Sequence, residues 1–260
     1  MDFKNWLIIN EISEDLYKNA ENLGEIPRKI IQNWISNHHN IDVGQLKNFD
    51  SLAQDFQKRR TFTTLFGWAV PCKEAVDLIK KYVQEPLYDV MAGTGYWSRI
   101  LKKAGINIKT SDVHKVFNKN YYHKSKESMY KPSFEIKPDK IKIRRKNALK
   151  IGYDLSTQRI KGDVFLSWPP YECPVATDIL DIIPVKTRVF YIGEGKGGCT
   201  GDLSFHVTLN KNFKLIAREN LPNFEGIHDS IYVYEKIINE PVDKKYRGKS
   251  FEWDLEKSEE

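Results

Sequence analysis

The first 65 residues carry apolar side chains three and four positions apart, which is the spacing of helices with one buried face. Proline is well accepted in a first helical turn, and Pro27 opens one of these stretches. We therefore expect residues 1–65 to form a helical N-terminal extension that packs on the rest of the chain. The stretches with this pattern are EISEDLYKNAENL (11–23), PRKIIQNWISNH (27–38) and FDSLAQDFQKRR (49–60).

From about residue 71 the pattern changes, and short apolar runs typical of strands alternate with amphipathic stretches typical of helices. The last two strands, 213–220 and 229–237, have only eight residues between them, which is too few for a crossover helix, so we expect an antiparallel hairpin at the sheet edge. The other expected strands are 87–91, 106–112, 141–148, 163–168 and 187–194, and the expected helices are 73–83, 96–105, 176–183 and 202–213.

This alternation predicts an α/β fold. We expect a seven-stranded, mostly parallel, doubly wound sheet with a terminal antiparallel hairpin, covered in part by the N-terminal helical cap. The sheet domain would occupy residues 66–240 and contain a basic insertion at 115–140. Residues 241–260 are dense in charge and are expected to form a loosely held tail.

Positive charge is concentrated in one part of the chain. The net charge is +6, yet residues 115–150 contain twelve Lys or Arg against three acids, which leaves the remainder slightly negative. Aromatic residues are interleaved with these cations, a combination that suits a polyanion with exposed bases. We predict RNA or DNA binding here, with a solvated, lysine-rich insertion that has no partner as the alternative. The residues predicted to contact phosphate are Lys142, Arg144, Arg145 and Lys146.

Cysteine usage and hydropathy indicate the compartment. Cys72, Cys173 and Cys199 are far apart and form no CxxC pair, which favours a reducing compartment over a disulfide framework or a zinc cluster. No apolar stretch approaches the roughly 20 residues that span a bilayer, and the first residues show no basic leader or cleavage site. We expect a protein that is not secreted and has no membrane partner, located in the cytoplasm or, in a eukaryote, the nucleus. Its oligomeric state is left open.

The stretch Tyr88-Asp-Val-Met-Ala-Gly-Thr-Gly95 joins an expected strand to an expected helix. Glycines at such a turn let the backbone approach a ligand without a clash from a Cβ atom. Asp112 ends the next strand, 17 residues after Gly95, where an acid can accept both hydroxyls of a ribose. This unit predicts the nucleoside-binding half of a Rossmann-like fold.

The segment Asp89-Val-Met-Ala-Gly-Thr-Gly95 resembles motif I of class I S-adenosylmethionine (SAM)-dependent methyltransferases, and the resemblance covers roughly residues 66–237. The family has a seven-stranded sheet whose last two strands form a hairpin. A dinucleotide-binding dehydrogenase is the competing interpretation, but it normally has a fuller GxGxxG and lacks that hairpin. Met91 stands where the motif usually has its first glycine.

The resemblance implies SAM as the cofactor. Because SAM brings its own electrophile and a neutral amine needs only carbonyl or carboxylate contacts, we expect no metal. The resemblance also implies that Asp89 lies near the SAM amino group, that the loop gives backbone room for the methionine portion, and that Asp112 holds the ribose. The third strand ends where family members contact the adenine. The cofactor-binding residues implied in this way are Asp89, Ala92, Gly93, Gly95, Asp112, Asn147 and Ala148.

The stretch SWPPYECP (167–174) follows the expected fourth strand, at the edge where an open parallel sheet holds its ligand. Pro169, Pro170 and Tyr171 resemble the (Asp/Asn/Ser)-Pro-Pro-(Tyr/Phe) motif of methyltransferases that act on exocyclic amines of bases. Trp168 occupies the polar position of that motif, and Ser167 is one residue early and would point to the other face. We predict a planar, amine-bearing acceptor, with a purely structural corner as the alternative.

Three further residues on the same edge are candidates. Glu194 opens a glycine-rich loop after the fifth strand and is predicted to orient the acceptor or act as a base, unless the loop is only a flexible connector. His228 lies in the loop before the last strand and is a candidate general base, although a hydrogen-bonded turn histidine would look the same. Trp68 precedes the first core helix and is predicted to cover the cofactor, which burial against the sheet would explain equally well.

The leading hypothesis is therefore a SAM-dependent methyltransferase acting on a planar amine such as a nucleic-acid base. A methyltransferase acting on a small molecule or a protein is the second hypothesis. A SAM-fold binding module without turnover is the third, because Met91 and Trp168 depart from the motifs.

Overall fold

The computed structural model describes residues 67–84, 86–93, 95–112, 144–145, 147–221, 223 and 226–249. The predicted N-terminal helical extension, the basic insertion at 115–140, Lys142 and Lys146 lie outside these residues. So do residues 250–260 of the predicted tail.

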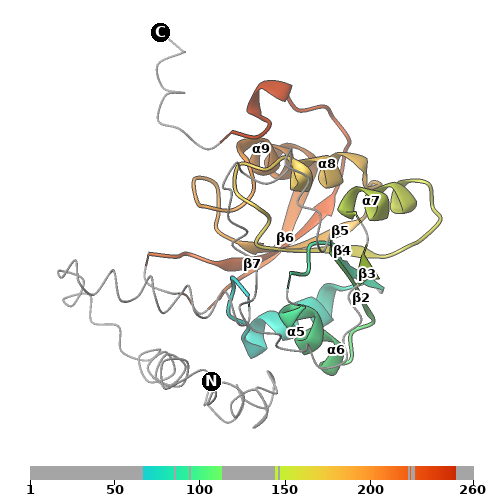
Figure 1. The fold of residues 1–260 in the computed structure, drawn as a ribbon, viewed down its shortest axis with the longest axis vertical. Helices are drawn as coiled ribbons and strands as arrows, with labels where there is room; N and C mark the ends of the chain where they lie inside the picture. The colour runs from blue at the N-terminus through green and yellow to red at the C-terminus, as the bar shows by residue number, and fades with distance from the viewer. Residues whose placement is uncertain are drawn as a thin grey trace, which may run out of the picture.

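The described residues form one sheet with strand order β3-β2-β1-β4-β5-β7-β6 (Figure 1). Pairing is parallel from β3 to β5, whereas β7 runs antiparallel to both β5 and β6. The predicted mostly parallel α/β sheet with an antiparallel hairpin at its edge is thus confirmed. The strands are β1 (Leu87–Asp89), β2 (Ile108–Asp112), the two-residue β3 (Arg144–Arg145), β4 (Asp163–Ser167), β5 (Arg188–Gly193), β6 (Phe213–Asn220) and β7 (Ser230–Lys236).

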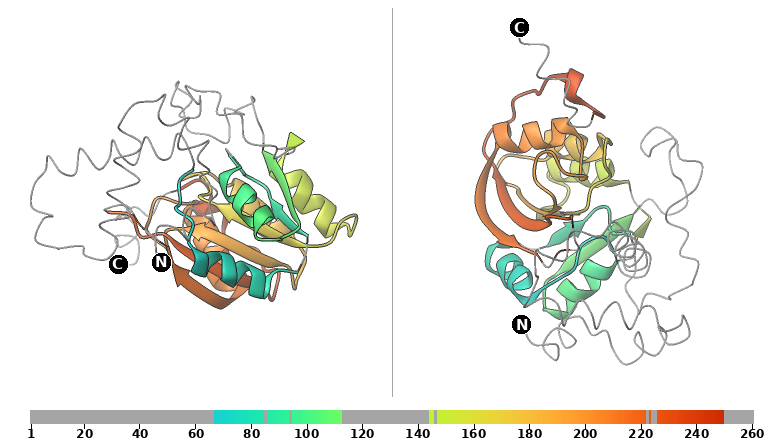
Figure 2. Two further views of the ribbon diagram at one scale, coloured as in Figure 1. Left: turned by 90° about the horizontal axis from the view of Figure 1, so that it is seen from below. Right: turned by 90° about the vertical axis from the view of Figure 1, so that its left-hand side faces the viewer.

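Helices cover the two faces of the sheet, as Figures 1 and 2 show. Helices α5 (Lys73–Tyr82) and α6 (Tyr96–Lys103) pack on one face, and α7 (Ala148–Ser156), α8 (Val175–Ile182) and α9 (Leu203–Asn212) pack on the other. Side chains alternate across a strand, so in β4 Phe165 joins the first core cluster while Val164 and Leu166 join the second. No helix among the described residues is long and apolar enough to cross a membrane.

Helix α7 was not expected from the sequence, which predicted a strand up to residue 148. Its helical signal is weakened by Gly152, since glycine disfavours a helix interior by roughly 1 kcal/mol relative to alanine. The structure explains this residue, because a Cβ atom at Gly152 would lie 2.6 Å from Cδ1 of Ile182 on α8. The glycine therefore permits the close approach of α7 and α8.

Lys236, at the end of β7, is fully buried. Its ammonium donates hydrogen bonds to the carbonyl oxygens of Leu180 (2.7 Å), Asp181 (3.0 Å) and Ile183 (2.8 Å). These carbonyls lie in the last turn of α8 and just beyond it, where no further helical N–H is present to pair with them. A single lysine therefore ties the end of α8 to the sheet.

The C-terminal tail is held against the domain up to Lys249, so the expectation that it is loosely held is wrong for this part. Arg247 forms ion pairs with Asp178 and Asp181, which lie three residues apart on α8. The tail also meets the start of α9, because the Gly248 N–H donates to Asp202 Oδ2 (2.7 Å) and the Leu203 N–H donates to the Lys249 carbonyl (2.8 Å). Its charges thus serve as specific contacts within the fold.

Candidate functional site

The turn between β1 and α6 lies at the carboxyl edge of the parallel strands, where an open α/β sheet binds its ligands. Gly93 and Gly95 have left-handed backbone angles, with φ of 54° and 75°, and Gly95 directly precedes α6. The turn is held by bonds from the Ala92 N–H to the Ser111 carbonyl (3.1 Å) and from the Gly95 N–H to the Ala92 carbonyl (2.8 Å). A Cβ atom at Gly93 would meet nothing within 4 Å, so this backbone faces open space.

Asp89, the last residue of β1, carries a carboxyl group buried beneath this turn. Its Oδ2 accepts a hydrogen bond from Ser98 Oγ (2.6 Å), and Ser98 in turn accepts one from Thr110 Oγ1 (2.8 Å). Its Oδ1 has no partner within the described part of the chain. Burial raises the pKa of this carboxyl to about 7. An unpartnered, buried carboxylate oxygen is suited to a cationic group of a ligand.

Asp112 ends β2, the strand beside β1. Its Oδ2 accepts a hydrogen bond from the Gly93 N–H at 2.6 Å, which fixes the glycine turn relative to this acid. The structure therefore brings together the five predicted cofactor residues of this edge: Asp89, Ala92, Gly93, Gly95 and Asp112.

Asn147 and Ala148, the predicted adenine contacts, have a different setting from the one expected. Asn147 caps the amino end of α7, and its Oδ1 accepts a hydrogen bond from the Leu149 N–H at 2.9 Å. Ala148 is buried in the core between α7 and the sheet. These residues thus begin a helix rather than end a long strand, and contact of Asn147 with an adenine stays a prediction.

Trp168 turns the chain sharply at the end of β4. Its φ of 51° lies in the left-handed region, which costs a residue with a side chain about 1 kcal/mol. Its backbone N–H donates to the Ile192 carbonyl on β5 (2.8 Å), and its indole Nε1–H lies 2.9 Å from both carboxylate oxygens of Asp229. The indole also stacks on Trp68, with ring centroids 5.0 Å apart and planes inclined by 20°. Trp68 and Trp168 therefore form one aromatic pair at the ligand edge.

Of the remaining residues of the SWPPYECP corner, some are buried and hydrogen-bonded and others are exposed. The Pro169 carbonyl accepts a hydrogen bond from the Gly201 N–H (2.9 Å), and the Glu172 N–H donates to the Gly201 carbonyl (3.0 Å). Pro169 is buried, Pro170 is half-buried, and Tyr171 is 41% exposed. The corner is thus joined to the end of the glycine-rich loop, and the Pro169 carbonyl already has an internal donor.

Glu194 braces the glycine-rich loop that follows β5. Its carboxylate is buried, with Oε2 accepting from the Cys199 N–H (2.7 Å) and Oε1 from the His228 N–H (3.1 Å). Thr200 Oγ1 accepts from the Glu194 N–H (3.0 Å), and the hydroxyl of Tyr191 contacts both Thr200 and the Glu194 carbonyl. Hydrogen bonds of Glu194 thus join both ends of this loop to each other and to the residues that lead into β7.

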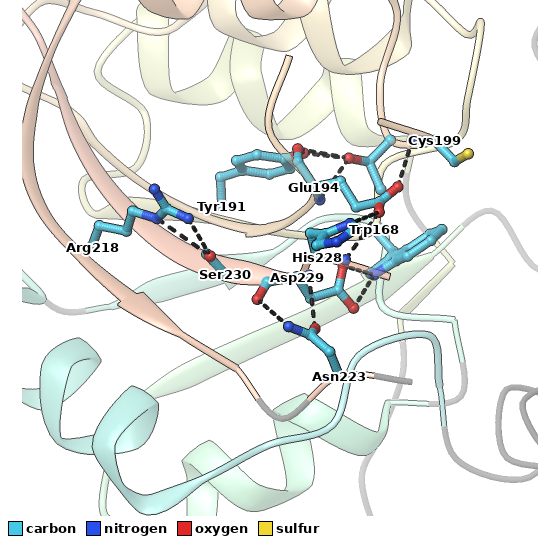
Figure 3. A network of polar contacts seen from close by, with 10 residues as sticks. Trp168, Tyr191, Glu194, Cys199, Arg218, Asn223, His228, Asp229 and Ser230 are labelled. Atoms are coloured by element: carbon cyan, nitrogen blue, oxygen red, sulfur yellow. Dashed lines mark hydrogen bonds and ion pairs between the residues drawn. The ribbon is translucent and has the colours of Figure 1, made fainter. Parts of the chain in front are cut away.

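His228 lies next to this carboxylate. Its Nδ1 is 3.8 Å from Glu194 Oε1, and its side chain is 84% exposed. Figure 3 shows Trp168, Glu194, His228 and Asp229 in one network that joins the ends of β4 and β5 to the start of β7. The structure therefore brings Trp168, Glu194 and His228 together. Tyr171 follows Trp168 by three residues in the sequence.

Asp229 is a site residue that the sequence did not single out. It is buried, accepts the indole N–H of Trp168, and is fixed by a bond from its own N–H to Asn223 Oδ1 (2.7 Å). The only local signal was an acid directly before the last strand. Its partner lies 61 residues away in sequence, so only the fold reveals the pair.

Of the predicted phosphate contacts, Arg144 and Arg145 form β3 beside Ser111 and Asp112 of β2. Nucleic-acid binding by Lys142, Arg144, Arg145 and Lys146 stays a prediction. Among the residues that the structure places, no group of three or more His, Cys, Asp or Glu side chains is arranged to hold a metal ion.

No protein-family model matches the sequence, and no curated protein matches it. Several solved structures match this chain, all at low similarity. TehB from Haemophilus influenzae is 13% identical with a TM-score of 0.37, and the match covers 68% of this chain and 66% of that chain, just under two thirds.

Two further structures have TM-scores of 0.35 and 13% identity. One is a candidate rRNA methylase from Clostridium thermocellum, matched over 64% of this chain and 96% of that chain. The other is a candidate class I SAM-dependent methyltransferase, lmo1582, from Listeria monocytogenes, matched over 86% of this chain and 71% of that chain. At this level of similarity, the role of each residue has to be judged from the geometry of this chain.

Proposed function

We propose that the protein is a SAM-dependent methyltransferase. The observation that carries the proposal is the β1–α6 turn, in which a buried acid and open glycine backbone lie beside a second acid at the end of β2. This is the arrangement that a nucleoside with a cationic amino-acid tail needs. The strand order supports it, because the ends of β1 and β4 are adjacent and bring the SWPPYECP corner beside the turn.

The residues present fit SAM group by group. The unpartnered Oδ1 of Asp89 is suited to the ammonium of the methionine portion. The open backbone at Gly93 admits the ligand without a side-chain clash. Asp112 is suited to accept the ribose hydroxyls, and its Oδ2 also accepts the Gly93 N–H. Bound SAM supplies an electrophilic methyl group, so the main task of these residues is to position it.

For the acceptor, we propose RNA or DNA, on the basis of the net positive window at 115–150 and the half-exposed Tyr171 beside the corner. The amine of a base stays a predicted target. Two contacts that would hold such an amine are absent or occupied: Trp168 replaces the polar residue of the motif, and the Pro169 carbonyl accepts the Gly201 N–H. The same two contacts favour the alternative of a SAM-binding module without turnover.

Calorimetry with SAM tests the cofactor site first. We expect binding by the intact chain and at least tenfold weaker binding by Asp112→Ala, because the acid holds both the turn and the ribose. Glu219→Gln, an exposed acid on β6, is the matched control and should bind SAM normally. Absence of SAM binding, or an Asp112→Ala protein that binds as tightly as the parent, would contradict the proposal.

Incubation with tritiated methyl donor then separates the acceptors. We expect label in total nucleic acid and not in protein extract. Changing Lys142, Arg144, Arg145 and Lys146 together to Gln should weaken nucleic-acid binding and flatten its dependence on salt. Unchanged affinity in that variant would remove the phosphate-binding role of these residues.

A further inference from the structure

Glu194 and His228 lie at neighbouring strand ends, Glu194 directly after β5 and His228 two residues before β7. The last pair in the β5–β7 register is Gly193 with Ser230, so Glu194 leaves β5 beside the residues that lead into β7. The register thus brings the two residues to the same edge of the sheet, where Glu194 Oε1 and His228 Nδ1 are 3.8 Å apart. The pair lies one strand over from the SWPPYECP corner, because Ser167 of β4 pairs with Ile192 of β5.

The two members of the pair have opposite environments. The Glu194 side chain is 7% exposed, and each of its oxygens accepts a backbone N–H, so the carboxylate is fixed. Gly198 is required for this packing, since a Cβ atom there would lie 2.3 Å from Glu194 Cβ. The imidazole of His228 is 84% exposed. A fixed carboxylate beside Nδ1 leaves Nε2, across the ring, available to a molecule at the edge of the sheet.

The chemistry available here differs for amines and hydroxyls. A neutral amine attacks a methyl group with its own lone pair and needs carbonyl or carboxylate acceptors to orient its N–H groups. The Pro169 carbonyl and the Glu194 carboxylate accept internal N–H groups instead, and Trp168 is itself a donor. A hydroxyl group is a poor nucleophile until a base removes its proton, and an exposed histidine oriented by a carboxylate is suited to that step.

We infer that His228 is the catalytic base for a hydroxyl-bearing acceptor and that Glu194 is the positioning residue that orients it, an inference that rests on the proposed methyltransferase function. The acceptor oxygen bonds to the methyl carbon of SAM while the carbon–sulfur bond breaks and its electron pair stays on sulfur. The hydroxyl proton passes to Nε2 of His228. The products are a methyl ether, S-adenosylhomocysteine and one proton, which the imidazolium later releases to water.

Two probes distinguish the sources of such a hydroxyl. RNA and DNA of the same sequence are incubated with tritiated methyl donor, and the RNA is digested to nucleosides and analysed by mass spectrometry. Catechol serves as the small-molecule probe, with aniline as its amine counterpart. We expect label in RNA on the ribose 2′-hydroxyl and none in DNA, or label in catechol and none in aniline.

Variants then test the two roles. His228→Ala should lower kcat about 100-fold or more with little change in the KM for SAM, and added imidazole should restore part of the rate. Glu194→Gln should lower kcat less, and the double variant should be no slower than His228→Ala alone, because the two act as a unit. If Glu194 had only a structural role, the double variant would have a lower kcat than His228→Ala. Glu219→Gln is the control and should keep the parent rate.

Calorimetry with SAM, done first, distinguishes a failure of the proposed methyltransferase function from a failure of the base assignment. A chain that does not bind SAM contradicts the proposed function itself. The base assignment alone is overturned if SAM binds and any one of three results follows: the label appears only on base amines or aniline, neither RNA nor catechol is labelled, or His228→Ala turns over at the parent rate.

Discussion

The buried carboxyl group of Asp89 makes the stability of the folded protein depend on pH. The Ser98 hydroxyl donates a hydrogen bond to one oxygen of the Asp89 carboxyl group, and burial raises the pKa of this group to about 7. Without a ligand, the folded protein therefore keeps a proton that the unfolded chain loses near pH 4. This proton contributes stability that is complete below about pH 4 and is lost as the pH rises through about 7.

We predict that SAM binds more tightly as the pH rises from 5.5 to 8. The ammonium of SAM prefers the charged carboxylate, so below about pH 7 binding must release the proton from Asp89, and affinity should change by up to tenfold per pH unit. Calorimetry in buffers of different ionisation enthalpy measures both the affinity and the released proton. Asp89→Asn should bind weakly at every pH, and an unchanged pH dependence in that variant would contradict the assignment.

Individual site residues differ in how far the sequence alone could reveal them. Gly93, Gly95 and Asp112 were predictable, because a turn between strand and helix and an acid at a strand end are local patterns. The bond from Trp168 to Asp229 was not, since it joins residues 61 positions apart. Trp168 looked like a defect in an amine-binding motif, and in the structure it donates to a buried acid and stacks on Trp68.

Among the elements, strands were easier to predict than helices. Strands β4, β5 and β7 are short apolar runs that are buried on both faces and bounded by clear changes in polarity. Helix α7 contains Gly152, whose role in packing against α8 is invisible until the two helices are placed together. The glycine-rich loop was predicted to border the acceptor or to be a flexible connector. In the structure its glycines make room for Glu194 and Tyr191, since a Cβ atom at Gly198 or Gly193 would collide with them.

Lys236 joins strand β7 to the end of helix α8. We predict that Lys236→Met lowers the free energy of unfolding by about 2–4 kcal/mol, because three carbonyls at the end of α8 lose their donor in a buried setting. Urea denaturation followed by circular dichroism measures the change. Lys214→Met, at an exposed position on edge strand β6, is the matched control and should alter stability by less than about 0.5 kcal/mol. Equal effects in the two variants would show that the buried ammonium does not hold α8.

The arrangement of the whole molecule follows from one sheet with a core on each face. Residues of β4, β5 and β7 supply alternate side chains to both cores, so the helices on opposite faces depend on the same strands. Because the strands are parallel from β3 to β5, the ends of β1, β4 and β5 meet at one edge and gather the candidate site there. The alternation of strands and helices predicted this edge, because the carboxyl ends of parallel strands lie on the same side of a sheet.

The docked tail could not be predicted in this way, because a charged segment near a chain end is usually solvated. In the structure Arg247 joins two acids on α8, and residues 248–249 bond to the start of α9. The tail therefore links the last helix of the sheet domain to α8, on the face away from α5 and α6.

We predict that Arg247→Ala lowers the free energy of unfolding by about 1–2 kcal/mol, because a half-buried guanidinium paired with two carboxylates is worth more than an exposed ion pair. Removing residues 244–260 should cost more, since it also removes the partners of Asp202 and Leu203 at the start of α9. Lys245→Ala removes an exposed tail cation and should leave stability nearly unchanged.

Chemical denaturation of the three proteins measures the order of their stabilities. SAM affinity should be the same in all of them, because the β1–α6 turn lies on a different part of the sheet. A truncated chain as stable as the parent would show that the tail contacts contribute nothing to the fold.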